Sequence, residues 1–72
     1  MSTIYTKEGE QEYSLKAIAA LKKTRYAVVQ PSMGNTMAVQ IVGENGLCEW
    51  DHFGGSDRTK KAIAEARSFV DQ

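Results

Sequence analysis

The chain has 72 residues, 42% of them hydrophobic, and its nine basic and nine acidic residues give a formal net charge of zero. Its single cysteine excludes an internal disulfide framework and a multi-cysteine metal site, and the charge balance argues against a dedicated nucleic-acid binder. The apolar runs are too short to span a membrane, and the first residues do not resemble a signal peptide. We therefore expect a single domain over residues 1–72, located in the cytoplasm, where a free thiol is stable.

The first third of the chain is predicted to contain one helix. Residues 1–9 are expected to be frayed or to form a short edge strand. A helix is predicted from Glu10 to Lys23, because Leu15, Ile18 and Leu21 recur at helical spacing. Ser14 is an alternative N-cap, so the start of this helix remains open over several residues.

Three strands are predicted to follow. The segment 26–30 is rich in β-branched and aromatic residues and ends at Pro31. Segments 36–42 and 47–53 are predicted to form a hairpin around Asn45-Gly46, the strongest short signal for a type I′ turn with two loop residues.

The number of loop residues decides which side chains of the hairpin enter the core. With two loop residues, Val42 lies opposite Glu49 and Ile41 lies opposite Trp50. The predicted core face holds Met37, Val39, Ile41, Cys48, Trp50 and His52, and the outer face holds Ala38, Gln40, Val42, Leu47, Glu49, Asp51 and Phe53. A loop with an odd number of residues would reverse this assignment.

The same rule leaves the register of the first predicted strand open. An even loop after it would place Tyr26 and Val28 in the core, and an odd loop would place Ala27 and Val29 there. The bulkier pair, Tyr26 and Val28, is preferred.

A final helix is predicted after Gly54-Gly55, with Ser56 or Asp57 as its cap and its end near Val70. Its apolar stripe consists of Thr59, Ala62, Ile63, Ala66, Phe69 and Val70. The predicted fold class is α+β in the order α-β-β-β-α, a three-stranded antiparallel meander with both helices packed on one face.

The sequence offers no convincing catalytic constellation. His52 is the only histidine, and Cys48 lacks an evident base that would activate its thiol. Both are interpreted as core or rim residues. The chain is therefore predicted not to be an enzyme and to have no catalytic residues, no cofactor and no metal.

Two surfaces remain as candidate partner-binding sites. The acidic sheet face is predicted to consist of Gln40, Glu49, Asp51 and Phe53, with the phenylalanine as an exposed anchor. The basic face of the last helix is predicted to consist of Arg58, Lys60, Lys61 and Arg67, for binding a protein or a nucleic acid. Their opposite charges also permit self-association.

The element order and the last helix also resemble the double-stranded RNA-binding domain over nearly the whole chain. In that family the last helix starts with lysines followed by alanines, a pattern similar to Arg58, Lys60, Lys61, Ala62, Ala64 and Ala66. The family's Gly-Pro-x-His turn is replaced here by residues 31–35, which contain no histidine. The resemblance implies duplex RNA binding as an alternative function.

The preferred functional prediction is a small non-enzymatic module that binds another protein. Chains of this size and type are common among accessory and inhibitor proteins of phages and mobile elements, including anti-CRISPR proteins. The partner is expected to be a protein of unspecified identity, with nucleic acid as the less favoured choice and no membrane contact.

Overall fold

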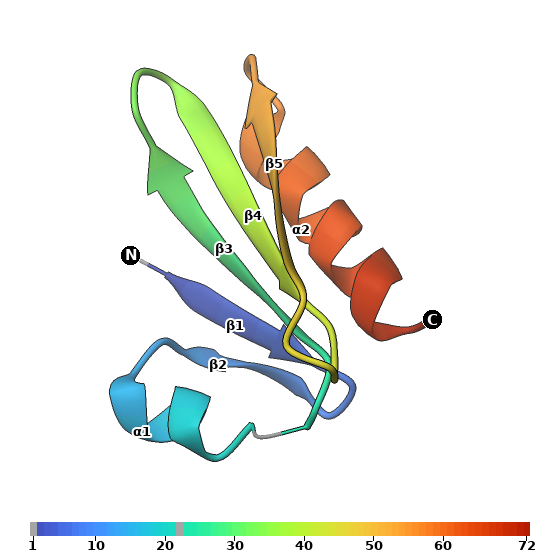
Figure 1. Cartoon of the computed structure of the whole chain (residues 1–72). Helices are drawn as coiled ribbons and strands as arrows, with labels where there is room; N and C mark the ends of the chain where they lie inside the picture. Colours follow the sequence, from blue (N-terminus) through green and yellow to red (C-terminus); the bar gives the residue numbers. More distant parts are fainter. Residues whose placement is uncertain (1, 22) are drawn as a thin grey trace.

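Five strands and two helices make up the computed structural model, which describes residues 2–21 and 23–72 (Figure 1). In chain order they are β1 (Thr3–Thr6), β2 (Gly9–Glu12), α1 (Leu15–Ala19), β3 (Tyr26–Ser32), β4 (Thr36–Val42), β5 (Cys48–Gly54) and α2 (Arg58–Val70). All strands pair antiparallel in the spatial order β2-β1-β3-β4-β5. The α+β class is correct, but the predicted three-stranded meander is wrong because the N-terminal segment adds two strands.

The N-terminal hairpin occupies residues for which a frayed end or a short edge strand and the start of a helix were predicted. Gly9 has a φ of +132°, which only glycine adopts readily, and it reverses the chain after β1. The Thr6 hydroxyl accepts a hydrogen bond from the Glu8 N–H at 3.2 Å within this turn. Strand β1 lies between β2 and β3, and Ile4 at its centre is fully buried. The N-terminal strand is therefore an interior strand of the sheet.

Helix α1 is much shorter than predicted, and the alternative cap at Ser14 is the correct one. Its hydroxyl accepts a hydrogen bond from the Ala17 N–H at 3.0 Å. The preceding residues belong to β2, so the predicted start at Glu10 is wrong. Lys23 has a φ of +60°, a conformation that does not continue a right-handed helix.

The β4–β5 hairpin has three loop residues and not two. The Gly43 N–H donates to the Leu47 carbonyl at 2.9 Å, and the Gly46 N–H donates to the Gly43 carbonyl at 3.0 Å. Gly46 has a φ of +87°, whereas Asn45 keeps a negative φ, so the turn is not type I′. A turn followed by a glycine in the left-handed region is the usual three-residue solution. The odd loop reverses the predicted register of β5.

This reversal moves the side chains of β5 to the opposite sides of the sheet. Cys48 now lies opposite Val42 and Trp50 opposite Gln40, on the face away from α2. Cys48, Trp50 and His52 are all exposed, so their predicted core location is wrong. Glu49, Asp51 and Phe53 instead share the face that carries α2.

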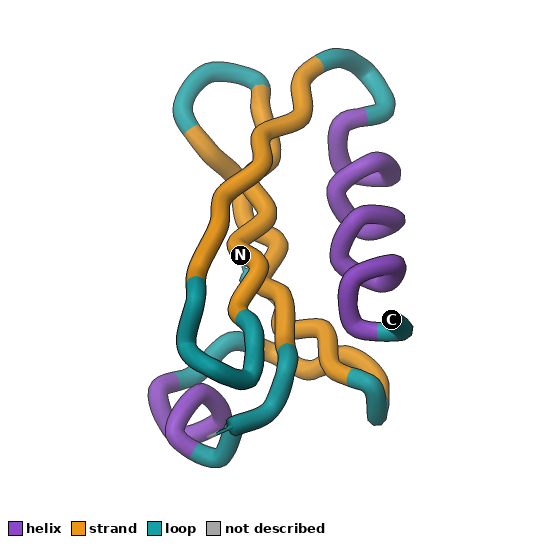
Figure 2. The backbone as a smooth tube through the Cα atoms, turned by 45° about the vertical axis from the view of Figure 1, so that its right-hand side comes forward, coloured by secondary structure: helices purple, strands orange, loops and turns teal. Residues whose placement is uncertain are grey.

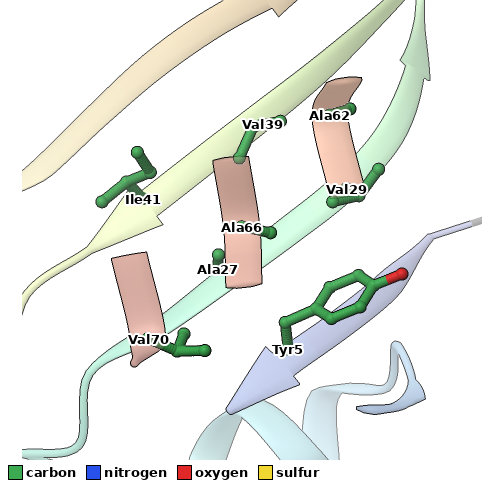
Figure 3. Close-up of a cluster of buried hydrophobic side chains, with 8 residues drawn as sticks. All are labelled: Tyr5, Ala27, Val29, Val39, Ile41, Ala62, Ala66 and Val70. Atoms are coloured by element: carbon green, nitrogen blue, oxygen red, sulfur yellow. The ribbon is translucent and has the colours of Figure 1, made fainter. Parts of the chain in front are cut away.

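The loop between β3 and β4 also has an odd number of residues. Ser32 pairs with Thr36, which leaves three residues in the loop, and Gly34 adopts a φ of +68° there. Ala27 and Val29 therefore point toward α2, which contradicts the preferred Tyr26 and Val28. The core cluster shown in Figure 3 consists of Tyr5, Ala27, Val29, Val39, Ile41, Ala62, Ala66 and Val70.

Helix α2 is confirmed close to its predicted bounds and packs chiefly against β3 and β4. The two helices lie on opposite sides of the sheet, so their predicted location on one face is wrong (Figure 2). Ile18 and Leu21, from α1 and the residues after it, line an open cleft with Tyr26 and Val42 on the side away from α2. Among the described residues, no helix has the length and apolar character needed to cross a membrane.

Candidate partner-binding surface

The charged residues of the sheet are confined to one of its two faces. Glu10, Glu12, Glu49 and Asp51 all lie on the face that carries α2. We call the other side the distal face; its strand residues are Ile4, Thr6, Gln11, Tyr26, Val28, Gln30, Ser32, Thr36, Ala38, Gln40, Val42, Cys48, Trp50 and His52. These strand residues include no aspartate, glutamate, lysine or arginine. A face of an antiparallel sheet that meets only water is usually rich in charged residues.

One row of the distal face runs from a buried centre to an exposed aromatic ring. Ile4 pairs with Val28, Val28 with Gln40, and Gln40 with Trp50, so their side chains are neighbours across four strands. Ile4 is 0% exposed and Val28 1%, whereas the indole of Trp50 is 47% exposed. The exposed end of the row therefore lies on β5, at the edge of the sheet.

Cys48 lies next to this row with an exposed thiol. The side-chain amide of Gln40 donates a hydrogen bond from Nε2 to the Cys48 Sγ at 3.0 Å. Gln40 thus connects the β4 and β5 sides of the distal face, and it is half-buried.

Tyr26 lies on the distal face near the residues of α1 and those after it. Burial raises the pKa of the Tyr26 phenol, and the nearby Cys48 and Tyr13 raise this pKa further when they ionise. Tyr26 pairs with Val42, and Val42 pairs with Cys48, so these three side chains form a second row on the distal face. Tyr13 is 46% exposed, and its N–H donates to the Ser2 carbonyl at 3.2 Å, which continues the β1–β2 ladder. Tyr26, Cys48 and Trp50 form what we call the distal patch.

The strand geometry separates the two residues with the most reactive side chains. Cys48 and His52 share the distal face, but four residues of strand place their Cα atoms about 13 Å apart, with Trp50 between them. A cysteine nucleophile needs its base within hydrogen-bond reach. Within residues 2–21 and 23–72, no group of three or more histidine, cysteine or carboxylate side chains is arranged to hold a metal ion.

The structure divides the predicted acidic surface between the two faces. Gln40 lies on the distal face, and Glu49 and Asp51 lie on the α2 side of β5. Phe53 is half-buried and packs against the core beside Met37, so it is not an exposed anchor. The two carboxylates remain together and exposed at the sheet edge.

Three of the four predicted basic residues make contacts within the chain. Arg67 lies 3.5 Å from the Glu10 carboxylate, and Lys61 lies 3.5 Å from that of Asp57. Arg58 donates from Nη1 to the Gly55 carbonyl at 2.8 Å. Lys60 is exposed. Exposed ion pairs contribute little to stability, so these contacts orient the side chains without removing them from solvent.

A cleft with a volume of about 550 Å³ lies at the end of the molecule where α2 stops. Lys7, Lys23, Arg25 and Glu44 are among its lining residues. The Arg25 guanidinium donates to the Gln72 carbonyl at 3.0 Å and lies 4.9 Å from the centroid of the Phe69 ring. This arginine therefore stabilises the end of α2.

The distal patch was not predicted from the sequence because the predicted register of β5 placed Cys48 and Trp50 in the core. The signal was present in the alternation of Cys48, Trp50 and His52 with Glu49 and Asp51. That alternation separates the two sets under either register, and only the loop length decides which set faces α2.

No protein-family model, no curated protein and no solved structure matches this chain. Its function is therefore inferred from the geometry and composition of its surface.

Proposed function

We propose that this chain is a non-enzymatic protein-interaction domain that binds its partner through the distal patch. The observation that carries the proposal is the absence of charge from the strand residues of the distal face, combined with the exposure of Trp50 at its edge. The centres of protein interfaces are depleted in lysine, glutamate and aspartate and enriched in tryptophan and tyrosine. Residues that dominate binding energy are often tryptophan or tyrosine.

The flanking residues suit the same role. The Gln40 amide and the His52 imidazole supply hydrogen-bonding groups beside the indole, as polar groups do at the rim of an interface. The charged side chains at β2 and β5 lie on the α2 side, where they favour solubility of the unbound domain.

The finer predictions of an inhibitor or accessory protein from a phage or mobile element rest on size and type alone. Cytoplasmic location is part of the proposal and is supported by the exposed thiol of Cys48, which a reducing compartment would keep free.

Trp50 is the only tryptophan in the chain, so tryptophan fluorescence reports the surroundings of this side chain alone. We expect affinity capture from cells that naturally contain this protein to recover one stoichiometric partner, and Trp50→Ala to abolish the capture. Met33→Ala is the matched control, because Met33 is 92% exposed in the β3–β4 loop, away from the patch. With the purified partner, the emission of Trp50 should shift to shorter wavelength on binding. Equal capture by the wild-type chain and Trp50→Ala would contradict the proposal.

Duplex RNA binding loses its main support because the element order differs from that of the double-stranded RNA-binding domain. The remaining basis for this alternative is the basic side of α2. This alternative predicts that the chain shifts the electrophoretic mobility of duplex RNA and that added salt weakens this binding. Lys60→Glu combined with Lys61→Glu should remove the shift. No shift at low salt would end this alternative.

A further inference from the structure

Strand β5 forms the longer of the two free edges of the sheet. It has seven residues and no strand beyond it in the part of the chain that the structure describes, whereas the opposite edge strand, β2, has four residues. A free edge presents unpaired N–H and C=O groups, which an extended segment of another protein can bind as an additional strand. Figure 1 shows β5 along the outer side of the sheet, connected by a short segment to α2.

The hairpin geometry identifies which backbone groups face this edge. In antiparallel pairs, residues that bond to the neighbouring strand alternate with residues whose N–H and C=O point away from it. The Gly43–Leu47 hydrogen bond sets this alternation, so Glu49 and Asp51 bond to β4. Cys48, Trp50 and His52 therefore turn their N–H and C=O groups toward the free edge.

The side chains of β5 differ in character between the two faces. On the α2 side, Glu49 and Asp51 are exposed, and neither forms an ion pair with any residue that the structure describes. On the distal side, Trp50 offers an apolar surface between Cys48 and His52. A strand added at this edge would meet two unpaired carboxylates on one face and an aromatic ring on the other.

We propose that the free edge of β5 binds an extended basic segment of the partner, in which lysine or arginine alternates with apolar residues. This inference rests on the proposed function and specifies how the partner is recognised. The basic side chains pair with Glu49 and Asp51, and the apolar side chains cover Trp50. Cross-strand pairs of opposite charge are favourable, and like charges placed opposite one another are unfavourable.

The same charges disfavour a second copy of this chain as the occupant. Antiparallel pairing of two β5 strands would bring the carboxylates of both copies together on one face of the joined sheet. Acidic side chains on an edge strand are a recognised protection against such self-pairing. The free edge thus selects for a partner strand of opposite charge.

The test uses two short synthetic peptides, one that alternates lysine with valine and one that alternates glutamate with valine. We expect the full chain to bind the lysine peptide about tenfold more tightly, because two attractive cross-strand pairs replace two repulsive ones. Glu49→Lys combined with Asp51→Lys should invert this preference. Glu8→Lys combined with Glu44→Lys changes the net charge by the same amount at two exposed positions outside β5, and it should keep the lysine preference.

Amide hydrogen exchange locates the bound peptide. The amides of Trp50 and His52 should become protected when the lysine peptide binds, and those of Glu10 and Glu12, which face the free edge of β2, should not. Equal affinity for the two peptides, or binding without protection of the β5 amides, overturns the edge proposal. If Trp50-dependent capture of the partner persists in that case, the interaction function stands and the partner binds the distal patch without adding a strand.

Discussion

The guanidinium of Arg67 lies over the ring of Tyr5, with its central carbon 5.9 Å from the ring centroid. The same guanidinium lies 3.5 Å from the carboxylate of Glu10. Because Arg67 belongs to α2, Tyr5 to β1 and Glu10 to β2, these contacts join the last helix to the N-terminal hairpin. They attach to α2 a segment whose first residues were predicted to be frayed or to form a short edge strand.

The first prediction concerns alkaline stability. Burial raises the pKa of the Tyr5 phenol above its ordinary value of 10.0; the charge of Glu10 and its hydrogen bond to the phenol raise it further, and Arg67 lowers it. A pKa raised by folding means that the neutral phenol is favoured in the folded state. The contribution to stability is complete below pH 10.0 and is lost as the pH rises through the folded-state pKa.

Tyr5→Phe should therefore move the midpoint of alkaline unfolding to higher pH, as followed by circular dichroism. Tyr26→Phe should act in the same direction, because burial also raises the pKa of the Tyr26 phenol. An unchanged midpoint in both variants would show that neither phenol contributes to the pH dependence.

The second prediction concerns the contact between α2 and the sheet. Ala62 and Ala66 are fully buried, and their small side chains let the helix approach β3 and β4 closely. Ala66→Leu should lower the free energy of unfolding by about 1–3 kcal/mol through overpacking. Ala64→Leu, on the exposed side of the same helix, should change it by less than about 0.5 kcal/mol. Urea denaturation of both variants measures the difference.

The third prediction concerns the turn that sets the register of β5. Gly46 has a φ of +87°, and no atom lies within 4 Å of the position that a Cβ would occupy. Gly46→Ala should therefore cost about 1–2 kcal/mol through backbone strain alone. Gly54→Ala, where φ is not in the left-handed region, should cost less in the same thermal unfolding measurement. Equal costs would mean that the turn tolerates a side chain at Gly46.

The fourth prediction concerns the N-terminal strand. Ile4 is 0% exposed, so Ile4→Ala should cost about 2–5 kcal/mol of unfolding free energy. Leu15 is 81% exposed, and Leu15→Ala should cost less than about 0.5 kcal/mol. Similar denaturation midpoints for the two variants would show that β1 contributes little to the folded state.

The parts of the fold that were predictable are those encoded by local patterns. The apolar stripe of α2 identified Ala62, Ala66 and Val70, and the segments of β3, β4 and β5 were located within one or two residues. The N-terminal hairpin was not predictable in the same way. The segment 9–12 contains no β-branched or aromatic residue, and its strand conformation follows from pairing with β1. Tertiary pairing overrides weak local preference.

The candidate site was not predicted because the β4–β5 loop was expected to have two residues and has three. Asn45-Gly46 fits a two-residue turn and also fits a three-residue turn in which only Gly46 has a positive φ. The sequence contains nothing that discriminates between them locally. In the observed register Phe53 lies opposite Met37 and packs against the core, whereas the alternative register would place Phe53 on the distal face.

The sheet order has a consequence for how the chain folds. Strands β3, β4 and β5 and helix α2 are contiguous in sequence and joined by short loops, so they can assemble at a small cost in loop-closure entropy. Pairing of β1 with β3 must close a longer segment that includes β2 and α1. We expect the N-terminal hairpin to dock last, so that β3 is itself an edge strand until folding is complete. Before the hairpin docks, the unpaired edge of the sheet would be β3, the strand that carries Val28. The acidic edge at β5 would already be formed.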